Sequence, residues 1–201
     1  MTGMLDATGG LVWRHTPEIL DHRNNRDKLR LSRDGGVVEF GFDVLSPQGD
    51  WIRRLARFNV AERKLQIDPT PDSSLTPPRI TGLNVVGWED NGKPTLNGKA
   101  LPLKTDESSE SLAISASADV FLLGAWDLRL FDGSGRAKWD QPMPSLAWDV
   151  NLSQDGRYAV AALGDGTIRW FAIADGKEVL ALFVHPDGKR WVCLLYTSRC
   201  V

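Results

Sequence analysis

Cysteine is nearly absent from this 201-residue chain. Its two cysteines, Cys193 and Cys200, both lie close to the C-terminal end. Neither has a cysteine partner elsewhere in the chain, and no histidine lies at the spacing that zinc sites use. These absences exclude a disulfide-rich scaffold and a cysteine–histidine zinc module.

An excess of charge and a long apolar run are also lacking. The chain has 24 basic and 26 acidic side chains, so its formal net charge is -2. This balance offers no basic stripe for nucleic acid or an anionic membrane surface, and no uncharged apolar segment could span a bilayer. With 42% hydrophobic residues, the chain has too much apolar material for a disordered segment. We expect a globular protein of one or two domains with no nucleic-acid partner and no membrane partner. Its compartment is unknown, with the cytoplasm as the default.

The motifs of catalysis are missing too. The three histidines, His15, His22 and His185, lie far apart, and none belongs to a nucleophile elbow or a His-Glu-x-x-His motif. A phosphate-binding Gly-rich loop is absent, and the carboxylates occupy turns rather than a repeated calcium loop. The sequence therefore predicts no catalytic residue, no metal and no cofactor, and indicates that the chain is not an enzyme.

What the chain does contain is an internal repeat. Residues 112–139 align with residues 150–179 at an offset of about forty residues, so that Arg129 matches Arg169. Each copy consists of short apolar strands separated by turns rich in Ser, Asp and Gly. Four short strands with regularly spaced turns are typical of one blade of a β-propeller.

The pattern recurs in the rest of the chain. Residues 29–65 repeat the Ser-x-Asp-Gly turn between apolar strands, and residues 4–13 match residues 130–139 position by position. Residues 69–110 are degenerate apart from an Asn97-Gly98 hairpin turn, and we interpret them as a divergent blade, with an inserted hairpin as the alternative. The predicted units are a half blade (1–13), blades at about 28–68, 79–103, 111–140 and 146–183, and the start of another blade (189–192). The expected fold is all-β, a partial β-propeller of about four four-stranded antiparallel blades in an incomplete ring.

These residues resemble the WD-repeat family, specifically its bacterial members. GDGTIRWF (164–171) is similar to the family's Asp-Gly-Thr-Ile-Arg-Leu-Trp strand, and NLSQDGRYAVAA (151–162) is similar to its Ser-Pro-Asp-Gly-Arg strand pair. The family's Gly-His pair is missing, and its Trp-Asp ending is replaced by Phe131-Asp132 and Phe171-Ala172. The resemblance implies a non-catalytic module that serves as a protein–protein interaction scaffold or sensor in a larger bacterial protein. Such proteins often carry a caspase-like peptidase or another signalling domain.

A second resemblance gives an alternative function. LDATGGLVW and FDGSGRAKW are similar to the Asp-x-x-Thr-Gly-Lys-x-x-Trp docking motif of quinoprotein propellers, although the spacing is one residue short. It implies a fragment of an enzyme that uses pyrroloquinoline quinone. The vicinal cysteines or calcium-binding carboxylates that many of those enzymes need are not visible in this sequence.

Alternation along residues 167–171 assigns side chains to the two faces of a central strand. Ile168 and Trp170 share one face, and Phe171 lies on the other. Because blades stack face to face, both faces are buried, and aromatic residues fill the space between neighbouring blades. The residues assigned to turns and to blade packing are Asp165, Gly166, Arg169, Trp170, Phe131 and Trp139.

Two of these assignments have a specific physical basis. The Asp165-Gly166 turn supplies a capping carboxylate and a glycine for positive φ, and Asp165 occupies the turn position of the WD-repeat family's buried Asp. Arg129 and Arg169 are expected to cover a neighbouring blade with their stems and to keep their charged heads in water.

A candidate binding surface follows from the loops. Four loops are expected to gather on one side of the propeller: 46–51, 124–127, 140–148 and 164–166. Trp51 and Trp126 lie in turns, where large aromatic residues are uncommon, and exposed aromatic residues often anchor interfaces. We expect Trp126, Asp127 and Trp148 to contribute to a patch that binds a protein partner of unknown identity. The alternative is that these rings fold under adjacent loops.

The last nine residues, CLLYTSRCV, have an unusual coding pattern. CLLYTS back-translates to the transposase end sequence of sequencing libraries, and the reverse complement of that sequence encodes Arg-Cys-Val and a stop. We therefore expect residues 193–201 to be a non-native tail outside the fold, with a genuine final strand as the alternative. An arc cut after Val192 is expected to expose apolar faces near Leu11 and Val192 and to self-associate through these open ends.

Overall fold

The computed structural model describes residues 2–8, 10–15, 19–25, 28–46 and 48–195. Within these ranges every regular element is a strand, and all strands pair in antiparallel fashion. The same ranges contain no helix with the length and hydrophobicity needed to cross a bilayer.

Three sheets are meanders in which the strands follow chain order from one edge to the other. The first blade consists of β3 (Arg30–Leu31), β4 (Val37–Leu45), β5 (Trp51–Asn59) and β6 (Lys64–Ile67). The second blade consists of β10 (Ser111–Ile114), β11 (Val120–Gly124), β12 (Asp127–Asp132) and β13 (Ala137–Pro142). The third blade consists of β14 (Ala147–Leu152), β15 (Tyr158–Leu163), β16 (Thr167–Ala172), β17 (Glu178–Val184) and β18 (Trp191–Leu195).

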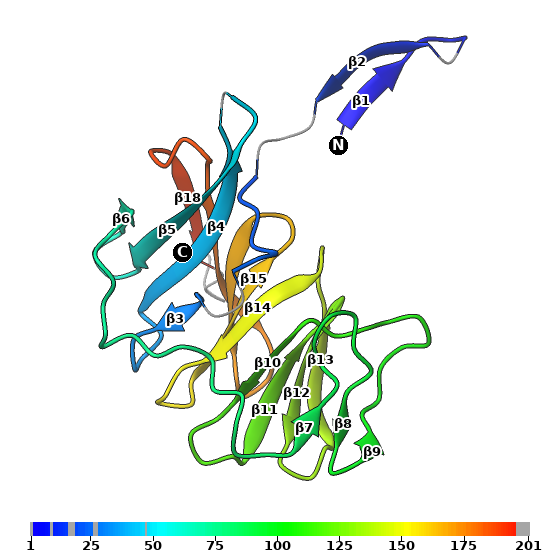
Figure 1. Ribbon diagram of the computed structural model, residues 1–201, viewed down its shortest axis with the longest axis vertical. Helices are drawn as coiled ribbons and strands as arrows, with labels where there is room; N and C mark the ends of the chain where they lie inside the picture. The colour runs from blue at the N-terminus through cyan, green and yellow to red at the C-terminus, as the bar shows by residue number, and fades with distance from the viewer. Residues whose placement is uncertain (1, 9, 16–18, 26–27, 47, 196–201) are drawn as a thin grey trace, which may run out of the picture.

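The blades are arranged around their first strands. Strands β3, β14 and β10 lie next to one another, whereas β6, β13 and β18 are the opposite edges of their sheets (Figure 1). Four-stranded meanders that stack face to face around inner strands are the architecture of a β-propeller. The predicted fold class, a partial and unclosed propeller, is confirmed.

The turns between the first two strands of a blade use side-chain hydrogen bonds. In the third blade, the Ser153 hydroxyl donates to Asp155 Oδ1 at 2.7 Å and accepts from the Tyr158 amide at 2.9 Å. Gly156 takes the positive φ of 73° that the turn requires. Ser32 makes the same two bonds in the first blade. The repeated Ser-x-Asp-Gly pattern thus forms the turn between the first two strands in the first and third blades.

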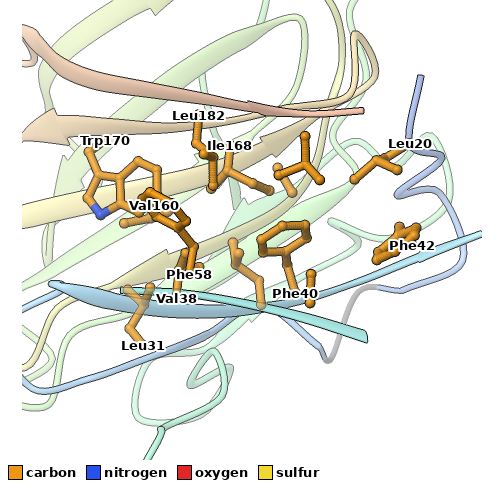
Figure 2. Packing of buried hydrophobic residues seen from close by; sticks show 14 of the residues in the cluster. Leu20, Leu31, Val38, Phe40, Phe42, Phe58, Val160, Ile168, Trp170 and Leu182 are labelled. Carbon is orange, nitrogen blue, oxygen red and sulfur yellow. The ribbon is translucent and has the colours of Figure 1, made fainter. Parts of the chain in front are cut away.

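The third blade is buried on both faces. Ile168 and Trp170 pack with the first blade, and Phe171 packs with the second blade, as the alternation of side chains predicts. Figure 2 shows Trp170 and Val160 facing Phe58 across the first of these contacts. The Trp170 indole also donates from Nε1 to the Gly35 carbonyl at 2.9 Å, which ties the two blades together.

The spatial order of the blades differs from their order in the chain. The first blade lies against the third blade, and the second blade lies on the third blade's other face. The connection after β6 makes this possible because it passes all three blades. The Thr76 amide and carbonyl pair with Leu31, the Thr76 carbonyl also accepts from Asn151 Nδ2 at 2.9 Å, and the Arg79 carbonyl accepts from the Ile114 amide at 2.6 Å.

This order corrects the expected open end near Val192. The face of the third blade that was expected to be bare is covered by the first blade, since both belong to one core. Val192, Leu194 and Leu195 are half exposed, but they lie on the outer strand β18. The side chain of Leu11, where the other open end was expected, lies outside the described residues.

Residues 79–103 form less than a full blade. Their small sheet consists of β7 (Val85–Val86), β8 (Thr95–Leu96) and β9 (Lys99–Ala100). Asn97 and Gly98, with φ of 51° and 80°, make the tight turn between β8 and β9. The sheet covers the second blade, where Val85 and Leu96 share a core cluster with Phe131. It remains small because two-residue strands bury few side chains.

The two ends of the chain also differ from expectation. β1 (Thr2–Leu5) and β2 (Leu11–His15) form a separate hairpin, which stands apart from the blades in Figure 1. Strand β18 extends to Leu195 and so includes residues that we placed outside the fold. Its backbone pairs with β17, and Trp191 meets the Phe58 ring edge-on at 5.0 Å between centroids. Backbone pairing accepts any β-prone sequence, whatever its origin.

Replacing Trp170 with alanine tests the contact between the first and third blades. The change removes a buried indole and its bond to Gly35, so we expect the free energy of unfolding to fall by about 3–5 kcal/mol. Urea denaturation of Trp170→Ala and of the unchanged protein measures the difference. A loss below about 1 kcal/mol would contradict the packing described.

Candidate interaction surface

The four loops predicted to gather do line one groove, whose volume is about 1060 Å³. Ser46 comes from the loop between β4 and β5, and Trp51 is the first residue of β5. Trp126 comes from the loop between β11 and β12. Leu146 precedes β14, and Gly164 follows β15. Residues 19–23 and 185–187, which the sequence did not assign to this surface, also contribute to its walls.

Hydrogen bonds fix three of these loops to one another. The Met143 amide donates to the Trp126 carbonyl at 3.0 Å, and the Gly164 amide donates to the Leu146 carbonyl at 2.9 Å. The Asp165 amide donates to the Ser145 hydroxyl at 2.8 Å. The loops of the second and third blades that form this wall are therefore linked to one another by hydrogen bonds.

The tryptophans of the groove differ in exposure. The side chains of Trp51 and Trp126 are exposed, at 62% and 54%, so neither ring is folded under a loop. Trp148 is half-buried and lies against Gly164, where an added Cβ would come within 3.0 Å of Nε1. The sequence pointed to Trp51 as unusual but did not include it in the patch.

Asp127 does not belong to this surface. The residue is only 4% exposed, and its carboxylate pairs with Arg129 at 2.8 Å and also with Lys104. Its place in the expected patch is corrected for this reason. Alternation along β12 turns Asp127 and Arg129 to the same face, where they meet each other.

Arg129 is the centre of a buried ionic cluster. Its guanidinium pairs with Glu107 at 2.7 Å, with Asp127 at 2.8 Å and with Asp140 at 3.0 Å, and its side chain is 4% exposed. The expectation that its head stays in water is therefore wrong, because residues 104–107 fold over it and bring Glu107 into contact. The charge of Arg129 is therefore neutralised by contacts within the fold.

The surroundings move the pKa values of two carboxyls in this cluster in opposite directions. Burial acts to raise the pKa of Glu107, but the hydrogen bond from Arg129 and two backbone amides bring it below the ordinary value. Burial, and the nearby charge of Asp127, raise the pKa of Asp140 even though Arg129 opposes this. Asp140 therefore takes up a proton more readily than Glu107 does.

Arg169, the counterpart of Arg129, lies in a shallower cluster beside the groove. It pairs with Asp165 at 3.0 Å and with Glu178 at 3.2 Å, and 19% of its side chain is exposed. Asp165 Oδ1 also accepts from the Thr167 amide, and Gly166 takes a φ of 80°. The Asp165-Gly166 turn is thus held in shape by the third blade's own strand.

The charges at the groove rim are paired with one another. The Arg23 guanidinium donates to both carboxylate oxygens of Asp21, and these bonds hold the pKa of Asp21 below its usual range. Asp43 pairs with Arg53 at 3.3 Å. Because these charges neutralise each other, the exposed aromatic and aliphatic groups are the distinctive chemistry of the groove.

In both segments that resemble the quinoprotein motif, an aspartate carboxylate accepts hydrogen bonds from the amides two and four residues later. Asp6 Oδ1 accepts from the amides of Thr8 and Gly10, each at 2.8 Å. Asp132 Oδ1 accepts from the amides of Ser134 and Arg136, each at 3.0 Å, and hydrogen bonds to this turn lower the pKa of Asp132 to about 2. Over the ranges that the structure describes, no group of His, Cys, Asp and Glu side chains is placed to hold a metal ion.

No protein-family model matches the chain, and a search of curated proteins finds no relative. Similar solved structures include Sqt1 of Saccharomyces cerevisiae, at 15% identity and a TM-score of 0.37 over 74% of this chain and 31% of that one. BamB from Moraxella catarrhalis has 13% identity and a TM-score of 0.36 over 85% and 38% of the two chains. U3-55K has 11% identity and a TM-score of 0.39 over 86% and 42%. The chain spans less than half the length of each of these structures.

Replacing Arg129 with methionine tests the buried cluster. The change leaves three carboxylates without their guanidinium, so we expect a loss of about 3–5 kcal/mol in the free energy of unfolding at pH 7. The loss should be smaller at about pH 4, where the carboxyls begin to take up protons. Urea denaturation at the two pH values measures both effects.

The control is Arg136→Met, which removes a surface ion pair with Asp132. Arg136 is 84% exposed, and such a pair contributes less than about 1 kcal/mol. Equal losses for the two variants would contradict the central role of Arg129.

Proposed function

We propose that this chain is a non-catalytic propeller segment that binds a protein partner in the groove lined by these loops. The observation that carries the proposal is the exposure of Trp51, Trp126 and Leu45 on one concave surface. Exposed apolar groups gathered in this way are typical of interaction sites, and tryptophan is among the residues that contribute most to binding energy.

The shape of the groove supports an extended peptide segment as the bound element. Its walls come from loops of all three blades and from residues 19–23, so a bound segment contacts several elements at once. The paired charges at the rim leave hydrophobic contact as the main source of affinity. By its resemblance to bacterial WD-repeat proteins, we propose that the segment is a scaffold or sensor module of a larger bacterial protein. In that protein it accompanies a caspase-like or other signalling domain.

A peptide library displayed on phage tests the groove without knowledge of the natural partner. Peptides are selected on the whole chain, and their affinity is then measured by calorimetry. We expect Trp126→Ala to raise the Kd of selected peptides about tenfold or more, since it removes an exposed anchor. Its free energy of unfolding should change by less than about 0.5 kcal/mol, because the ring is largely in solvent.

The matched control is Ile80→Ala, which removes an exposed apolar side chain outside the groove. It should leave peptide affinity unchanged. Selected peptides that bind Trp126→Ala and the unchanged protein equally would refute this groove as the binding site.

A further inference from the structure

Residues 19–25 form a segment that closes the joint between the first and third blades. Leu20 is buried in the core that these blades share. The backbones of Asp21 and Asp43 exchange two hydrogen bonds, of 3.3 Å and 2.8 Å. Ile19 lies against Gly166, where an added Cβ would meet the Ile19 Cβ at 3.0 Å. The same segment is one wall of the groove.

His22 is the buried ionisable group of this segment. It is 1% exposed, and its ring lies edge-on to Phe40 at 5.8 Å between centroids. Nδ1 is 3.0 Å from the Gly41 carbonyl, to which it donates in the neutral ring. Nε2 is buried and has no hydrogen bond of normal geometry among the described residues. A neutral imidazole fits this place, whereas an imidazolium would bring a charge into it, a cost that the nearby Gly166 backbone only partly offsets.

The surroundings of His22 include a second buried polar side chain. Next to it, both amide atoms of Asn25 are buried without a hydrogen bond among the described residues. Asn25 also fills the space over Gly41, where an added Cβ would lie 2.5 Å from Oδ1. A charge on the His22 ring would therefore enter a buried place that already contains unpaired polar atoms.

The charges that act on His22 are those of Asp21 in the same segment and Asp165 in the turn after β15. Asp21 also pairs with Arg23, and Asp43 on β4 bonds to the Asp21 backbone. Burial has the largest effect and lowers the pKa of His22 below the ordinary value of 6.5, although the Gly41 and Gly166 backbones and the two carboxylates Asp21 and Asp165 oppose it. Residues 19–25 therefore bind fewer protons when they lie in the joint between the blades than when they are detached from it. Docking weakens as the pH falls through about 6.5.

We propose that His22 is a proton-operated latch, whose protonation releases residues 19–25 from the joint and removes one wall of the groove. The consequence for binding rests on the proposed function of the groove. The release itself does not, because it concerns only contacts within this chain.

Hydrogen exchange by NMR tests the latch on the whole chain. The reporters are the amides of Asp21 and Asp43, which bond to each other's carbonyls. After correction for the intrinsic exchange rate, we expect their protection to fall about tenfold between pH 7.5 and pH 5.5. Amides of β15 in the third blade should keep their protection. Equal protection of Asp21 and Asp43 at the two pH values would overturn the proposal.

Two substitutions identify the titrating group. His22→Gln should make the protection of Asp21 and Asp43 independent of pH, and His22→Phe carries the same test if the glutamine does not dock. His185→Gln is the matched control, because His185 lies at the groove, is partly exposed and pairs with Asp187. A response that survives both changes at His22, or that disappears with His185→Gln, would contradict the latch.

Peptide binding separates this proposal from that of the groove. If protection falls at pH 5.5 and a selected peptide binds more weakly there, both proposals are supported. If protection falls while affinity stays constant, the latch stands and the groove is not the binding site. Constant protection overturns the latch whatever the affinity does.

Discussion

The burial of both faces of the third blade is the constraint on which the rest of the structure depends. Its strands carry Ile168 and Trp170 on one side and Phe171 on the other, so the sheet needs a cover on each side. The first and second blades supply the two covers. A single sheet of this composition would expose both apolar faces, and isolated blades are not stable without neighbours. The hydrogen bond from Trp170 to Gly35 is directional, and it joins two blades whose contact is otherwise mainly hydrophobic.

The groove follows from this arrangement. Each blade is a meander that begins at the centre, so the loops after the second strands open to the same side. Stacking then brings Trp51 and Trp126 to one surface although they come from different blades. Residues 19–25 complete the groove because Leu20 takes part in the core between the first and third blades. The same contact between blades therefore determines the stability of the fold and the shape of the surface.

Local features could be predicted from the sequence, whereas the choice of neighbours could not. The Ser-x-Asp-Gly turns and the opposite faces of Trp170 and Phe171 depend on residues close together in the chain, and both follow from the pattern. The contact between the first and third blades depends on how apolar faces match across more than a hundred residues, and a repeat pattern contains no such information. The size of the small sheet was predicted wrongly for a related reason. The sequence pattern suggested a blade at residues 79–103, but the extent of this sheet depends on how much of the second blade is left uncovered.

Among the surface residues, too, some features could be predicted from the sequence and others could not. The sequence left open whether Trp126 is exposed or folded under a loop; it is exposed, whereas Asp127, the next residue, is buried against Arg129. Its partner Glu107 comes from a segment without regular structure, so strand alternation could not reveal the cluster. The sequence likewise gave no sign that His22 is buried, because its contacts come from Phe40 and Gly41 in a strand of the first blade.

The most direct test of this account is a nuclear Overhauser measurement on the Trp170 indole. Its Nε1 proton should show cross-peaks to the α-protons of Gly35, because the two groups are hydrogen-bonded at 2.9 Å. Cross-peaks between these residues would establish that the first blade lies against the third. Cross-peaks from Trp170 to the small sheet instead, with none to Gly35, would contradict the order of the blades and the groove built on it.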